Sequence, residues 1–178
     1  MSYIEPTDSS AKYYGSYTVT GTDWQGNDPT TWMPLDILAA QQLYGVAKAT
    51  PLSGGQVFGF NCNVSGVTEQ FFDFTINKTP VITVWDAGTG NTLDLSGYST
   101  TATVNLNAGA YSSFAGMTNN MAIAYGTAID TVIGTSGDDI FMSIPLATRS
   151  RAAAAPTPSS SRAPRRSTRP AAQAAQRP

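Results

Sequence analysis

The sequence predicts a mainly β protein: a β-roll or β-solenoid-like sandwich with one short N-terminal helix and a disordered C-terminal tail. Three observations support this fold class. Charged residues make up only 12% of the chain, about half the usual share of roughly 25%. Short β-branched and aromatic runs alternate with turns rich in Gly, Asn and Asp, which is typical of stacked β structure. Only one segment spaces its apolar residues as a helix does.

That helix is expected over Pro34–Gly45. Pro34 and Asp36 suit a helix start, and Gly45 suits its end. Leu35 and Leu43 belong to the apolar positions that recur at helical spacing between them. The segment is about three turns long.

Strands are expected wherever apolar and β-branched residues alternate or cluster between turn residues. The clearest run is 80–85, which is followed by a tight turn at 86–91. The predicted strands are 56–61, 69–76, 80–85, 92–98, 103–107, 122–125 and 129–133, and a further one begins at Ile140 and Phe141.

Charge divides the chain at residue 147. Residues 1–146 hold all twelve acidic residues and three lysines, a net charge of −9, whereas residues 147–178 hold seven arginines and no acid. An acidic body argues against nucleic-acid binding and suits metal cations or secretion. Residues 147–178 have almost nothing to bury, so we expect them to be disordered, and their arginines lack the interleaved aromatics of a nucleic-acid site.

Other counts exclude several kinds of chemistry. The chain has no His, which rules out Ser-His-Asp and Cys-His catalysis and every zinc site that needs imidazole. Cys62 is the only cysteine, so no internal disulfide forms. No apolar stretch approaches the ~20 residues of a membrane span, and no basic-then-apolar secretory leader opens the chain.

One motif indicates calcium. Residues 134–142 read G-T-S-G-D-D-I-F-M and match the nonapeptide G-G-x-G-x-D-x-U-x, with Thr135 in place of the second Gly. Glycines turn the chain so that carbonyls point inward, and Asp139 supplies a hard carboxylate. One repeat gives about half a coordination shell, and an ordinary Asx/Gly turn is the alternative. The candidate ligands are Gly134, Ser136, Asp138 and Asp139.

A longer pattern resembles the serralysin-type zinc metalloproteases. Residues 85–98 read W-D-A-G-T-G-N-T-L-D-L-S-G-Y, similar to W-D-A-G-G-N-D-T-F-D-F-S-G-Y at the start of that family's C-terminal domain. Residues 34–45 resemble D-I-A-A-I-Q-x-L-Y-G, the last helix of its protease domain. Residues 52–61 resemble R-T-G-D-T-V-Y-G-F-N, and 124–139 resemble the stretch that leads into the calcium repeats. Met1-Ser2-Tyr3 resembles the family's S-x-M-S-Y Met-turn.

The resemblance implies three regions and two calcium sites. Residues 1–45 would be a remnant of the protease domain, 46–146 the calcium-binding β-roll domain, and 147–178 the tail. Asn91 stands where the family has Asp and Asp130 where it has Glu, so calcium affinity should fall with the lost charge. The implied ligands of the first site are Leu52, Gly54, Gln56, Asp86, Gly88, Thr89 and Asn91, and those of the second are Thr89, Asn91, Ala128 and Asp130.

The resemblance does not extend to catalysis. The family's H-E-x-x-H-x-x-G-x-x-H is absent, and Tyr3 would be only a remnant outer zinc ligand. A catalytic zinc needs about three good protein ligands, so we expect calcium but no zinc, and no proteolysis by this chain alone.

The resemblance thus implies the calcium-binding C-terminal domain of a secreted metallopeptidase, monomeric and exported by a type I system. The tail does not resemble that system's C-terminal signal, and a frameshift near codon 142 would explain it. Two alternatives are a non-enzymatic β-roll binding module and a split gene whose upstream piece supplies the zinc helix.

Overall fold

The computed structural model describes residues 28–47, 50–142 and 149–151. These residues form mainly short strands with two short α-helices, which confirms the predicted β-rich fold class. The helical elements are α1 (Pro34–Tyr44), the 3-10 helix η2 (Gly66–Thr68) and α2 (Glu69–Phe72). The strands are β1 (Val57–Gly59), β2 (Ile82–Val84), β3 (Thr92–Asp94), β4 (Thr103–Asn105), β5 (Tyr111–Ser112), β6 (Met121–Ile123), β7 (Thr131–Ile133), β8 (Ile140–Met142) and β9 (Arg149–Arg151).

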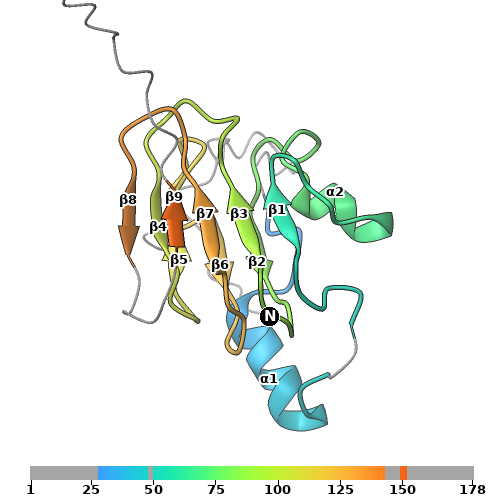
Figure 1. Cartoon of the computed structure of the whole chain (residues 1–178). Helices are drawn as coiled ribbons and strands as arrows, with labels where there is room; N and C mark the ends of the chain where they lie inside the picture. Colours follow the sequence, from blue (N-terminus) through green and yellow to red (C-terminus); the bar gives the residue numbers. More distant parts are fainter. Residues whose placement is uncertain (1–27, 48–49, 143–148, 152–178) are drawn as a thin grey trace, which may run out of the picture.

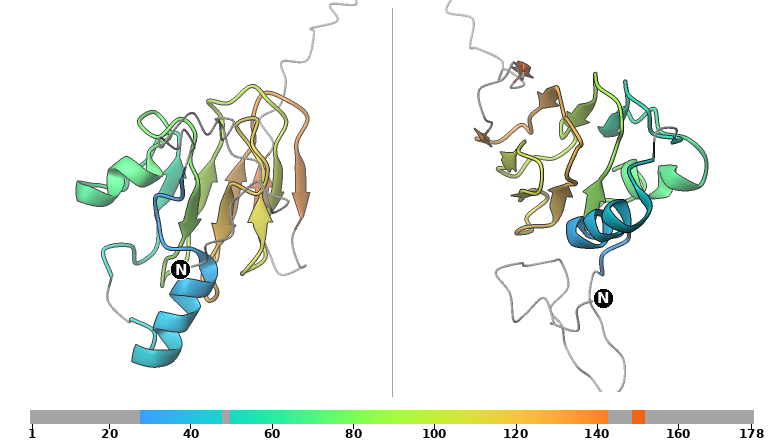
Figure 2. Two further views of the ribbon diagram at one scale, coloured as in Figure 1. Left: turned by 180° about the vertical axis from the view of Figure 1, so that it is seen from behind. Right: turned by 90° about the horizontal axis from the view of Figure 1, so that it is seen from below.

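The strands form three small ladders that wind around a common core (Figures 1 and 2). One ladder is entirely parallel and has the order β1-β3-β7-β9. A second pairs β4 with β8, also parallel. In the third, β2 pairs with β6 in parallel and β5 pairs with β6 in the antiparallel direction. Parallel pairing of strands far apart in sequence is the arrangement expected of coils stacked on one another.

The last three strands begin at intervals of nine residues. Strand β7 begins at Thr131, β8 at Ile140 and β9 at Arg149, and these strands belong alternately to the β1-β3-β7-β9 ladder and the β4-β8 ladder. The nonapeptide 134–142 thus supplies one turn and strand β8.

The core follows from the register of the ladders. Phe58, Leu93 and Val132 occupy matched positions on β1, β3 and β7, and each is 0% exposed. Beside this column, Phe74 packs against Phe114 with ring centroids 5.6 Å apart. Apolar residues at matched positions of parallel strands stack into a continuous interior, which is the main stabilising term of the fold.

Helix α1 confirms the one helix expected from sequence. The Met33 backbone N–H donates to the Asp36 carboxylate at 3.3 Å, and the Gly45 N–H donates to the Gln41 carbonyl at 2.9 Å. Gly45 has a φ of +82°, a conformation that favours glycine at a helix end. No described helix has the length and apolar character that a bilayer crossing requires.

The strand predicted over 69–76 is wrong. Residues 69–72 form α2, and the Asp73 N–H closes the helix on the Glu69 carbonyl at 2.8 Å. Phe72 and Phe74 are both buried, so their alternation imitated a strand. The Asp73 carboxylate accepts hydrogen bonds from the Thr75 N–H and hydroxyl at 2.7 and 2.6 Å, just after the helix.

Two further differences concern strands that the sequence did not indicate. Strand β5 has only two residues, and its partner β6 fixes it. Strand β9 lies inside the segment predicted to be disordered, and it pairs with β7 in parallel register. Backbone pairing needs no apolar side chain, so composition could not reveal it. The other residues of that segment, 147–148 and 152–178, lie outside the described residues, as do Met1-Ser2-Tyr3.

Candidate functional site

The turns at 52–56 and 86–91, which precede β1 and β3, lie against each other. The Gly55 N–H donates to the Thr89 carbonyl at 2.9 Å. A Cβ on Gly88 would lie 2.2 Å from the Ser53 carbonyl oxygen, and one on Gly54 would lie 2.7 Å from that of Thr89. Carbon and oxygen normally stay about 3.3 Å apart or more. Only glycine at these two positions lets the turns approach so closely.

Asp86 lies at the contact between these turns and is 0% exposed. Its Oδ2 accepts a hydrogen bond from the Gly54 N–H at 3.3 Å, and its Oδ1 accepts one from the Gly88 N–H at 2.5 Å. Both partners of the carboxylate in the described part of the chain are backbone N–H groups, so no side-chain cation offsets its charge there. A buried carboxylate in that position favours a cation beside it.

The predicted carbonyl ligands of the first site already accept hydrogen bonds within the loop. The Leu52 carbonyl accepts one from the Thr50 hydroxyl, and the Gly54 carbonyl accepts one from Gln56 Nε2 at 3.3 Å. The Gln56 carbonyl accepts one from the Thr92 N–H at 2.8 Å. A carbonyl oxygen has two lone pairs, so each retains acceptor capacity. The donor set of carbonyls and one carboxylate is hard oxygen, which fits calcium.

Asn91, in the turn at 86–91, connects the turn at 52–56 to the turn at 127–130. It is 0% exposed, and its Oδ1 accepts a bond from the Gln56 N–H at 3.1 Å. Its Nδ2 donates to the Ala128 carbonyl at 3.0 Å and to the Gly88 carbonyl at 3.5 Å. The Asp130 Oδ2 accepts bonds from the Gly90 and Asn91 N–H groups at 2.6 and 3.2 Å. The structure thus brings together the residues predicted for the second site.

The repeat turn at 134–139 lies at the opposite end of the fold. The turns at 86–91 and 127–130 precede β3 and β7, whereas 134–139 follows β7, and these strands are parallel. Asp139 Oδ1 accepts bonds from the Ala102 N–H and the Thr135 hydroxyl at 2.9 and 2.8 Å, and its Oδ2 accepts one from the Thr135 N–H at 2.6 Å. Thr135, which departs from the glycine of the motif, therefore adds a donor to this carboxylate.

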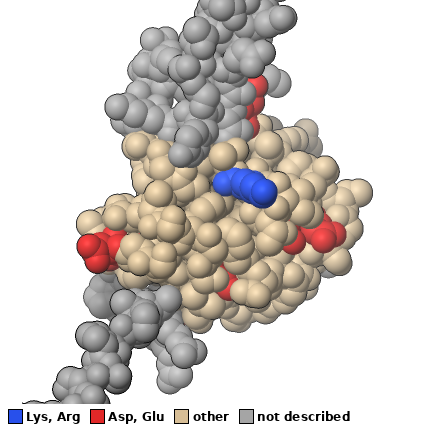
Figure 3. Space-filling model, turned by 90° about the horizontal axis from the view of Figure 1, so that it is seen from above, with Lys and Arg blue, Asp and Glu red and all other residues tan. Residues whose placement is uncertain are grey.

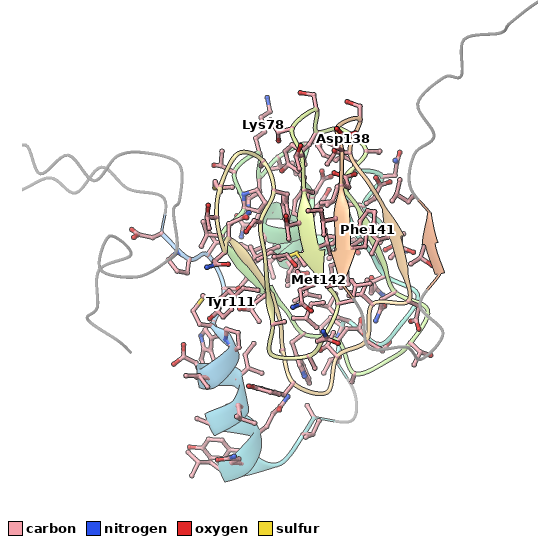
Figure 4. All side chains as sticks on the ribbon, turned by 90° about the vertical axis from the view of Figure 1, so that its left-hand side faces the viewer. Lys78, Tyr111, Asp138, Phe141 and Met142 are labelled. Carbon is pink, nitrogen blue, oxygen red and sulfur yellow. The ribbon has the colours of Figure 1, made fainter. Side chains whose placement is uncertain are left out.

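The other repeat residues lie at the surface of the same turn. Ser136 and Asp138 are exposed, and Figure 4 shows Asp138 at one end of the fold, with Phe141 and Met142 farther along β8. A Cβ on Gly134 would lie 2.3 Å from Asp139 Oδ2, so a larger residue there would displace that carboxylate. Within the described residues the carboxylates do not gather: no group of three or more His, Cys, Asp or Glu side chains is placed to hold a metal.

One contributor to the site was missed by sequence reasoning. The Thr127 hydroxyl accepts a hydrogen bond from the Asp86 N–H at 3.0 Å and donates one to the Asp86 carbonyl at 3.3 Å. A Thr separated from Asp86 by 41 positions carries no local signal. Tyr3, the remnant zinc ligand of the prediction, lies outside the described residues.

Comparisons with known proteins agree with the resemblance seen in the sequence. The model of the Peptidase M10 serralysin C-terminal family matches residues 47–168. Serralysin C of Dickeya chrysanthemi is 40% identical over 135 residues, 75% of this chain and 27% of that protein. Serralysin B of the same organism is 41% identical over 124 residues, 69% of this chain and 25% of that protein. Metalloprotease AprA of Pseudomonas entomophila is 38% identical over 113 residues, 63% of this chain and 22% of that protein.

The chain spans about a quarter of the length of these relatives. The family match, the identity to several serralysins and the stacked parallel strands agree with one another. This chain belongs to the Peptidase M10 serralysin C-terminal family.

Proposed function

We propose that this chain is the calcium-stabilised C-terminal β-roll module of a secreted serralysin-like metallopeptidase. Calcium would bind where the turn at 86–91 meets the turn at 52–56. Asp86 would supply the charge, and the carbonyls of Leu52, Gly54 and Thr89 would supply further oxygens. The ion would neutralise the buried carboxylate and tie the two turns together.

The observation that carries this proposal is the complete burial of Asp86 between two glycine turns, with a backbone N–H group donating to each of its carboxylate oxygens. The overall charge supports it. Residues 28–47 and 50–142 contain nine acidic residues and a single lysine, Lys78. Figure 3 shows a few acidic groups on a mostly uncharged surface. A site of low local charge would bind calcium with modest affinity, as extracellular modules do.

The repeat turn at 134–139 would contribute less to calcium binding. Both oxygens of Asp139 already accept strong donors, three in all, so an ion would have to displace them. Location outside the cell and a role beside an upstream protease domain belong to the same proposal. They rest on the serralysin relatives.

The test is thermal unfolding of the full chain in chelator and in millimolar calcium. A ligand at a hundredfold excess over Kd adds about 2.7 kcal/mol to the free energy of unfolding. We expect Asp86→Asn to remove most of this increment and Asp139→Asn to remove less. Glu69→Gln, which makes the same charge change on the remote helix α2, is the matched control and should leave the increment intact. If all three variants kept the wild-type increment, the proposed position of calcium would be wrong.

A further inference from the structure

The Asn91 side chain is buried and uses all of its polar atoms between backbone segments. Its Oδ1 accepts from the Gln56 N–H at 3.1 Å, and its Nδ2 donates to the carbonyls of Ala128 and Gly88 at 3.0 and 3.5 Å. This arrangement also fixes the orientation of the amide. A flipped amide would place its oxygen against two carbonyl oxygens and its NH2 group against an N–H.

The two carbonyls belong to turns that must be held side by side. Gly88 lies in the turn before β3 and Ala128 in the turn before β7, and β3 pairs with β7 in parallel. The negative ends of the two carbonyl dipoles point at one spot, which must hold either a cation or hydrogen-bond donors. Asn91 Nδ2 supplies the donors at that spot.

Asp130, the carboxylate expected to complete a second ion site, has one oxygen, Oδ2, held by backbone N–H groups. Its Oδ2 accepts bonds from the Gly90 and Asn91 N–H groups at 2.6 and 3.2 Å, and its own N–H donates to the Asn91 carbonyl at 2.9 Å. The second predicted calcium position does not fit an ion, because Asn91 Nδ2 already donates to the Ala128 and Gly88 carbonyls there. An amide NH2 group lies among the oxygens that an ion would need.

We propose that the Asn91 amide takes the place of a calcium ion between the turns at 86–91 and 127–130. This junction then forms without metal, and calcium is confined to the position beside Asp86, between the turns at 52–56 and 86–91. This inference deepens the proposed function. Only its statement that calcium binds beside Asp86 rests on that function. It follows that Asn91→Asp removes both donors, adds a buried negative charge, and converts the junction into a calcium-dependent one.

The experiment compares the full-length wild type, Asn91→Asp and a matched control, Asn120→Asp. Asn120 is also buried, accepts from the Phe114 N–H at 3.1 Å and donates to the Pro80 carbonyl at 2.8 Å. It precedes β6, which is parallel to β2, whereas the turn at 86–91 follows β2, so it lies at the other end of the strands. Calcium is titrated calorimetrically into each protein, and melting is followed by circular dichroism in chelator and in calcium.

We expect Asn91→Asp to bind one more calcium ion per chain than the wild type and to show the larger calcium-dependent rise in Tm. Asn120→Asp should lose Tm equally in chelator and in calcium. If Asn91→Asp is unfolded in chelator, calcium should refold it. The proposal is overturned if Asn91→Asp binds no additional calcium, or stays unfolded in calcium. A wild type that neither binds calcium nor gains stability from it would contradict the proposed function. A gain of calcium binding by Asn91→Asp would still support this inference.

Discussion

Replacing Gly88 by Ala tests the close contact between the two turns. The added Cβ would lie 2.2 Å from the Ser53 carbonyl oxygen and 2.5 Å from the Gly54 Cα, so backbone must move. Overpacking of this kind costs about 1–3 kcal/mol. Separation of the turns also weakens the bond from the Gly54 N–H to Asp86, worth about 1 kcal/mol. The free energy of unfolding should fall by about 3 kcal/mol, and Tm by roughly 10 °C.

The assay is urea unfolding of Gly88→Ala beside Gly66→Ala, each with and without calcium. Gly66 has a φ of +76° and open space around it, so its substitution measures backbone strain alone, about 1–2 kcal/mol. Gly88→Ala should also lose part of the calcium increment, whereas Gly66→Ala should keep it. A Gly88→Ala variant as stable and as calcium-responsive as the wild type would refute the reasoning.

Two further predictions concern the core and the chemistry. Phe74→Ala should lower the free energy of unfolding by about 3–5 kcal/mol, because Phe74 is 0% exposed and packs against the rings of Phe60, Tyr98 and Phe114. Chemical denaturation checks this, and a loss under about 1 kcal/mol would mean that the aromatic cluster contributes little. The purified chain should not hydrolyse casein with added zinc, because it contains no His; hydrolysis that a zinc chelator abolishes would contradict this.

Much of the fold was predictable because local signals agreed with tertiary packing. Pro34, Asp36 and Gly45 bounded α1 correctly, and the β-branched run at 80–85 contained β2. The prediction failed at 69–76, where buried Phe72 and Phe74 alternate as in a strand but local hydrogen bonds form a helical turn. Periodicity records which side chains are buried, and it does not record which backbone groups pair.

For the site, the positions of the residues could be predicted from the sequence, but the directions of their hydrogen bonds could not. The family resemblance of residues 52–61, 85–98 and 124–139 implied which turns meet, and the structure brings Asp86, Asn91 and Asp130 to those turns. The directions of the hydrogen bonds were not predictable, because Asn91 can offer an oxygen or an NH2 group and only its tertiary neighbours decide. Thr127 was missed for the same reason, since its bond to Asp86 spans 41 positions.

The most direct test of the calcium proposal is isothermal titration of the metal-free chain with calcium, repeated on Asp86→Asn. The buried carboxylate supplies the charge at the predicted ion position, and ligand charge helps to set calcium affinity. The wild type should therefore give a saturable binding isotherm that Asp86→Asn lacks or shows with at least about tenfold weaker affinity, equivalent to 1.4 kcal/mol. Identical isotherms for the two proteins, or no binding by a folded wild type, would contradict the account.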